Sequence, residues 1–195
     1  MAARWLTGRR DTGYRRHGGV RMNSAVRKLM LATHLTCSVG WIGAVVAYIV
    51  LDLTVATSVD PDAVRAAWIG MGLITFSVIV PFAVASLITG LAISLGTKWG
   101  LFLHWWVLIS LALTLLALLV LLVETRVIAQ SAGVAADAGA SAADVLALQP
   151  TLPHSVGGLL VLVLVQVLNV YKPTGLTPYG WRSQLSERAS RKGST

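Results

Sequence analysis

Charge is what this sequence has least of. Only 12% of its 195 residues are Asp, Glu, Lys or Arg, against roughly 25% in an ordinary soluble chain, and 55% are hydrophobic. These values exclude a soluble globular domain. Cysteine is also scarce, because Cys37 is the only one and no disulfide can form within the chain. The common catalytic patterns (HExxH, GxSxG, a Walker loop) are absent from the sequence, which therefore favours a non-enzymatic protein.

The charges that are present leave four long segments without any. These segments run from 29 to 51, 66 to 97, 99 to 123 and 145 to 171. A charged side chain at the centre of a membrane helix costs roughly 2.5 to 3.5 kcal/mol, and about 20 apolar residues cross the hydrocarbon. Each segment therefore predicts one span. The expected fold is all-α, a polytopic four-helix transmembrane bundle with up-and-down connections.

We expect a transmembrane domain at residues 27–173, with spans at about 27–53, 62–95, 103–128 and 153–172. Residues 1–26 are expected to form a basic disordered tail and 174–195 a polar tail. A start at Met22 is an alternative, because it keeps Arg27 and Lys28 before the first span.

Three local signals lie between these bounds. Asp60 followed by Pro61 predicts the start of the second helix, and Pro81 predicts a bend inside it. Ser141 with Asp144 resembles a capping box, which predicts one short surface helix before the fourth span.

The basic residues flank the spans. Eight of the 16 Lys and Arg residues precede the first span, five follow the last, and Lys98 lies in the short second loop. Cytoplasmic loops carry an excess of Lys and Arg, so both termini are predicted to be on the cytoplasmic side of the cell membrane. This placement suits anionic lipid headgroups and argues against nucleic acid as a partner, despite the net charge of +8.

Polar side chains form stripes along three spans. The stripes are His34, Ser38, Trp41, Val45, Tyr48 and Asp52 on the first span, Ser110, Thr114, Ala117, Leu121 and Glu124 on the third, and His154, Gly158, Val161, Val165 and Asn169 on the fourth, with Gln166 to one side. At 100° per residue, each stripe runs along one helix face. A span gains nothing by turning polar groups to lipid, so we expect these faces to meet protein or a cavity.

Two histidines share one spacing. His34 lies six residues after Lys28, and His104 lies six residues after Lys98. If each lysine marks the inner surface, both imidazoles lie about 9 Å deeper, on parallel helices that are diagonal in a simple bundle. The spacing therefore predicts His34 and His104 as the axial ligands of one haem b. The alternatives are structural histidines, or a copper or zinc site for which two imidazoles are few ligands.

Two functional hypotheses follow. The first is an accessory subunit, with a membrane protein or a second copy of the chain as its partner, that holds the haem. The second is a small proton, ion or solute carrier that uses Asp52, Glu124, His154 and Asn169. Asp52 and Glu124 fall at predicted span ends, where acidic residues commonly stop a helix, and the chain lacks the paired broken helices typical of transporters.

Three runs of the sequence carry a family resemblance: HLTCSVGWIGAVVAYIVLDL, GTKWGLFLHWWVLISLALT and LPHSVGGLLVLVLVQVLNVYKPTGLTPYGWR. They resemble a group of small actinobacterial integral membrane proteins without an assigned activity. The resemblance covers roughly residues 26 to 183 and leaves out the basic tail. It implies four spans in the cytoplasmic membrane of a bacterium, and it assigns neither a function nor any ligand residue.

Overall fold

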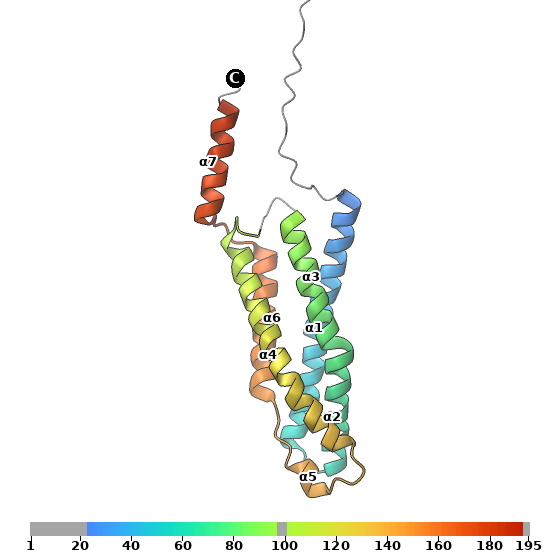
Figure 1. The fold of residues 1–195 in the computed structure, drawn as a ribbon. Coiled ribbons are helices and arrows are strands. Elements are labelled where there is room, and N and C mark those ends of the chain that lie inside the picture. The colour runs from blue at the N-terminus through green and yellow to red at the C-terminus, as the bar shows by residue number, and fades with distance from the viewer. Residues whose placement is uncertain (1–22, 97–100, 193–195) are drawn as a thin grey trace, which may run out of the picture.

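The computed structural model describes residues 23–96 and 101–192, and these segments are helical without any strand (Figure 1). The helices are α1 (Ser24–Thr57), α2 (Pro61–Ile74), the π-helix η1 (Thr75–Ile79), α3 (Val80–Gly96), α4 (Trp105–Ala136), α5 (Ala142–Leu146), α6 (Leu152–Tyr171) and α7 (Pro178–Lys192). Because α2, η1 and α3 form one continuous helix, four helices are long and apolar enough to cross a membrane. The predicted all-α bundle of four transmembrane helices is confirmed. Of the basic tail predicted for residues 1–26, residues 1–22 lie outside the described residues, and α1 already begins at Ser24.

The four spans form a ring. The first span, α1, packs against the continuous helix α2–η1–α3 on one side and against α6 on the other, while α4 packs against α2 and α6. Consecutive spans are therefore neighbours, and α1 and α4 are diagonal. The start of α1 and helix α7 lie at one end of the bundle, which we call the termini end, and α5 lies at the other, the α5 end (Figure 1). Which end faces the cytoplasm, and which membrane holds the bundle, remain predictions from the charges.

The core is best developed toward the α5 end. Trp68 and Met71 of α2 are completely buried there, and Ala135 of α4 and Val145 of α5 pack in the same cluster. Along the rest of the bundle many large apolar side chains point outward, as Leu122 does on α4. Only a lipid bilayer covers such surfaces without cost, so the protein is an integral, multi-pass membrane protein.

The second span is distorted one turn before its proline. The prediction placed the irregularity at Pro81, whereas the structure has a π-helical stretch at Thr75–Ile79, where the Val80 N–H donates to the Thr75 carbonyl. Proline lacks an N–H, and its ring clashes with the carbonyl four residues earlier, which belongs to Ser77. A widened turn accommodates both effects without breaking the span.

The third span is longer than predicted, since α4 continues to Ala136 instead of ending at residue 128. The additional residues are rich in alanine, the best helix former. Arg65 of α2 then satisfies the end of the helix and the turn after it, because its guanidinium donates to the carbonyls of Ala135, Asp137 and Ala140.

The predicted caps are present. The Asp60 carboxylate accepts from the Asp62 N–H at the start of α2, and Ser141 and Asp144 form the capping box of α5. At the termini end the polar tail folds as α7, a helix that was not predicted. Thr177 precedes it, accepts from the Gly180 N–H, and ties it to the chain before α4 by donating to the Phe102 carbonyl.

Candidate functional site

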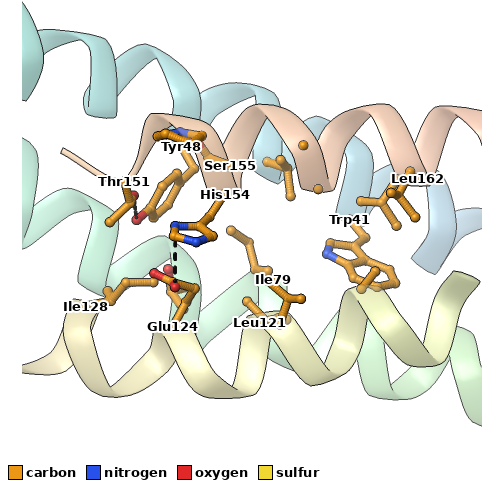
Figure 2. Close-up of a pocket in the computed structure, with 18 of the residues that line it drawn as sticks. Trp41, Tyr48, Ile79, Leu121, Glu124, Ile128, Thr151, His154, Ser155 and Leu162 are labelled. Atoms are coloured by element: carbon orange, nitrogen blue, oxygen red, sulfur yellow. Dashed lines mark hydrogen bonds and ion pairs between the residues drawn. The ribbon is translucent and has the colours of Figure 1, made fainter.

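A cavity of about 330 Å³ lies between all four spans, on the side of the bundle nearer to α5. Figure 2 shows its two ends. Tyr48, Thr151 and Glu124 lie at the end nearer to α5, and Trp41 and Leu162 lie at the opposite end. Most of the remaining lining is aliphatic, so the cavity is an apolar chamber with polar groups concentrated at one end.

Asp52 holds the first turn of α6 against α1. Its side chain is completely buried, and its two carboxylate oxygens accept from the Thr151 N–H at 2.8 Å, the Thr151 hydroxyl at 3.0 Å and the Ser155 hydroxyl at 2.9 Å. Thr151 is the N-cap of α6, where backbone N–H groups have no partner inside the helix and the helix dipole favours a negative charge. Asp52 therefore supplies from α1 the capping oxygens that the Thr151 side chain itself does not.

Tyr48 extends this network to the cavity wall. Its hydroxyl lies 2.8 Å from the Thr151 hydroxyl oxygen. Because the single hydroxyl proton of Thr151 is donated to Asp52, the Tyr48 hydroxyl is the donor in this pair. The phenol oxygen keeps its acceptor capacity, and the Tyr48 side chain lines the cavity.

Glu124 and His154 face each other from α4 and α6. His154 Nδ1 lies 3.5 Å from Glu124 Oε1 (Figure 2). The His154 side chain is 58% exposed and the Glu124 side chain 16%. The prediction treated Glu124 as a residue that ends its span. Since α4 continues to Ala136, the carboxylate instead belongs to the interior of the helix and lines the cavity.

Thr75 is a site residue that sequence reasoning missed. It lies in the π-helical stretch, is completely buried and lines the cavity, and its hydroxyl has no hydrogen-bond partner among the described residues. An unsatisfied buried hydroxyl costs about 1–3 kcal/mol. The only sequence signal was Pro81, because a proline within a span distorts the helix before it, and Thr75 lies in that distorted stretch. π-Helical turns accommodate distortions of this kind and occur frequently at functional sites.

His34 and Ser38 join α1 to α3 toward the termini end. His34 Nδ1 lies 3.0 Å from the Ser86 carbonyl oxygen and 3.1 Å from Thr89 Oγ1, and the Ser38 and Ser86 hydroxyls are 2.8 Å apart. Gly90 makes room for the imidazole, since a Cβ atom there would lie 3.0 Å from His34 Cε1. The first-span stripe thus faces other helices or the cavity along its whole length.

His104 does not lie inside a helix. It is the extended N-cap residue of α4 and pairs with Leu176 in an isolated β-bridge, and its ring centroid lies 6.4 Å from that of Trp106. Lys98 is outside the described residues. Because the described residues 101–104 are not helical, the helical rise assumed up to His104 does not apply, and neither His34 nor His104 lines the cavity. The haem ligation by these two residues stays a prediction.

The remaining candidates are set apart. Gln166 and Asn169 are half-buried on α6 and do not line the cavity. Of the four predicted carrier residues, Glu124 and His154 line the cavity, Asp52 lies behind its wall against Thr151, and Asn169 does not join them. Within the described segments, no group of three or more His, Cys, Asp or Glu side chains could hold a metal ion. The described segments therefore offer no cluster of side chains that would support the copper or zinc alternative.

Comparisons with models of protein families, with curated proteins and with solved structures find no match to this chain. The resemblance to actinobacterial membrane proteins stays a prediction, and function has to be inferred from the cavity and the groups around it.

Proposed function

We propose that this protein is a membrane-embedded carrier for small lipid-soluble molecules, which it holds in the cavity between its four spans. The observation that supports the proposal is the cavity itself. Its volume of about 330 Å³ falls at the lower end of the range of about 300–1,000 Å³ that is typical of small-molecule sites. An apolar wall with a few convergent polar groups is also typical of such sites.

The cavity borders both lipid and the polar end of the bundle. Leu116 and Val120 of α4 line it and are also exposed on the outer surface of the bundle, which lipid covers. His154 lines the opposite part of the wall and is 58% exposed near the α5 end. A molecule dissolved in the bilayer can therefore reach the site from the side, and its polar head can be released toward the headgroups.

A paired glycine substitution tests the proposal. A Cβ added at Gly158 meets nothing within 4 Å, and Gly158 lines the cavity, so Gly158→Leu fills the cavity without backbone strain. A Cβ added at Gly43 also meets nothing within 4 Å, but Gly43 is exposed to lipid and does not line the cavity. Gly43→Leu is therefore the matched control.

The probe is a diazirine derivative of octanol, photolysed with the purified protein in lipid nanodiscs and mapped by mass spectrometry. We expect adducts on cavity residues such as Trp41, Leu121 and Leu162 in the wild type and in Gly43→Leu, and their loss in Gly158→Leu. Equal labelling of the cavity in Gly158→Leu, or adducts confined to lipid-facing residues in the wild type, would contradict the proposal.

Haem binding by an accessory subunit is the second candidate, and one contact favours it. His34 Nδ1 lies against the Ser86 carbonyl, and histidines that ligate metals commonly donate one ring N–H to such an oxygen while the other nitrogen binds. Membranes that contain the overproduced protein, reduced with dithionite, should then show a cytochrome b absorption band that His34→Ala abolishes. A colourless purified protein excludes this candidate.

A further inference from the structure

Among the described residues, the charged groups that line the cavity or lie directly behind its wall are carboxylates. Glu124 lines it, and the carboxylate of Asp52 lies one hydrogen bond behind the lining residue Thr151. The lining includes neither lysine nor arginine. Arg65 lies toward the same end of the bundle, but its guanidinium donates to three backbone carbonyls around the end of α4. His154 is therefore the only side chain of the lining that can offset this charge.

The two carboxylates differ in how well they are satisfied. Asp52 accepts three hydrogen bonds from neutral donors, next to the positive end of the α6 dipole. Glu124 has one polar contact among the described residues, at 3.5 Å to an imidazole that counts as a cation only when it is protonated. A carboxylate that is only 16% exposed and so weakly paired gains free energy from a cation that enters the cavity.

The other polar and aromatic groups of the wall suit the same kind of ligand. The rings of Trp41 and Tyr48 line the cavity, and aromatic faces attract ammonium groups. The hydroxyl of Thr75 is completely buried and has no partner in the described part of the chain, and its oxygen can accept from an N–H or face a positive charge. These three side chains come from two of the four spans, and Glu124 on α4 adds a third.

We propose that the cavity is selective for small organic cations, with the ammonium head between Glu124, Tyr48 and Thr75 and the apolar body directed toward Trp41. The proposal rests on the carrier function and names its substrate class. In the unliganded protein His154 occupies the place beside Glu124, and a bound ammonium group replaces it there.

Two isosteric probes separate charge from shape. Benzyltrimethylammonium and neopentylbenzene have the same outline, because a quaternary nitrogen in one replaces a quaternary carbon in the other. Each is titrated against the photoreactive octanol in phosphatidylcholine nanodiscs, whose lipid carries no net charge, and its half-displacing concentration is expressed as its concentration in the lipid phase. We expect the cation to displace the label at a concentration at least about tenfold lower, as a charge pair worth at least about 1.4 kcal/mol requires.

Glu124→Gln should abolish the preference for the cation while neopentylbenzene still displaces the label, which shows that the cavity is intact. Asp62→Asn is the matched control, because it removes one exposed carboxylate in the first turn of α2, outside the cavity, and should keep the preference.

The possible results are distinct. Equal displacement by the two probes, or a preference that survives in Glu124→Gln, overturns the cation proposal and leaves the carrier function standing. Cavity labelling that neither probe displaces also overturns the cation proposal. Absence of octanol labelling in the cavity overturns the carrier function, and the choice of substrate with it.

Discussion

Asp52→Ala is the most informative single perturbation of the fold. Removal of the carboxylate leaves the Thr151 N–H without its acceptor at 2.8 Å inside the bundle. The other two donors have alternatives. The Ser155 hydroxyl is already within 3.2 Å of the Leu152 carbonyl, and the Thr151 hydroxyl can donate to Tyr48 instead, since these two oxygens are 2.8 Å apart.

The expected cost follows from these partners. One orphaned buried N–H costs about 1–3 kcal/mol, and the loss of hydrogen bonds to a charged acceptor adds about 1.5–3 kcal/mol. With partial relaxation of the two hydroxyls, we expect Asp52→Ala to lower the free energy of unfolding by about 3–5 kcal/mol. Asp52→Asn keeps one oxygen for the Thr151 N–H and should cost about 1–2 kcal/mol.

The assay is unfolding of the purified protein in mixed micelles by titration with SDS, followed by tryptophan fluorescence. Hydrogen exchange of the amides at residues 151–155 reports whether the first turn of α6 opens selectively. Asp62→Asn, on an exposed position of α2, is the control and should change stability by less than about 0.5 kcal/mol. If Asp52→Ala also changed the free energy of unfolding by less than about 0.5 kcal/mol, or left hydrogen exchange in the first turn of α6 unaltered, the structural role assigned to Asp52 would be refuted.

Three further outcomes are expected. Arg65→Ala removes the donor to three carbonyls around the end of α4 and should cost about 1–3 kcal/mol in the same titration, with faster exchange in the last turn of α4; unchanged exchange there contradicts this role. Hydrogen bonds from Ser141, first from its hydroxyl and then from its backbone N–H, lower the pKa of Asp144. The cap therefore stabilises α5 above the ordinary pKa of an aspartate and is lost as the pH falls through the lowered pKa, so proteolysis of this loop should increase in acid. Ser141→Ala removes the hydroxyl but keeps the backbone N–H, and should therefore reduce that dependence. Gly90→Ala places a Cβ atom 3.0 Å from the His34 ring and should cost about 1–3 kcal/mol, whereas no loss would show that the ring moves aside freely.

The four spans were predictable because the cost of a charge in hydrocarbon is local. Each charge-free segment identifies a span without knowledge of the others, and the short connections between spans imply neighbours in a ring. The end of α4 was not predictable in the same way. Its final turns depend on Arg65, which lies 70 residues earlier in the sequence and reaches the Ala135 carbonyl only in the folded bundle.

The polar residues of the site were also visible in the sequence, but their partners were not. The stripes included Tyr48, Asp52, Glu124 and His154, because polar residues in spans are scarce. Which of them meet depends on helix rotation and vertical register, and these are set by packing. Asp52 bonds the backbone of a residue 99 positions away. Thr75 was missed for a related reason, since the π-helical turn changes which face of the span it occupies.

The dependence on local structure also explains why the spacing of the two histidines was a weaker guide than the hydrogen bonds of the two acidic residues. Equal spacing from a lysine says that two imidazoles lie at one depth only if both segments are helical, and residues 101–104, just before α4, are not. The roles of the two acidic residues can be assigned without an assumption about helical spacing, because the folded protein shows how many hydrogen-bond partners each carboxylate has. Asp52 accepts from three donors and has a structural role, whereas Glu124 has a single polar contact among the described residues. Glu124 and the Thr75 hydroxyl, which has no partner in the described part of the chain, line one cavity from different spans. This is the arrangement expected where a ligand, and not the fold, supplies the missing partner.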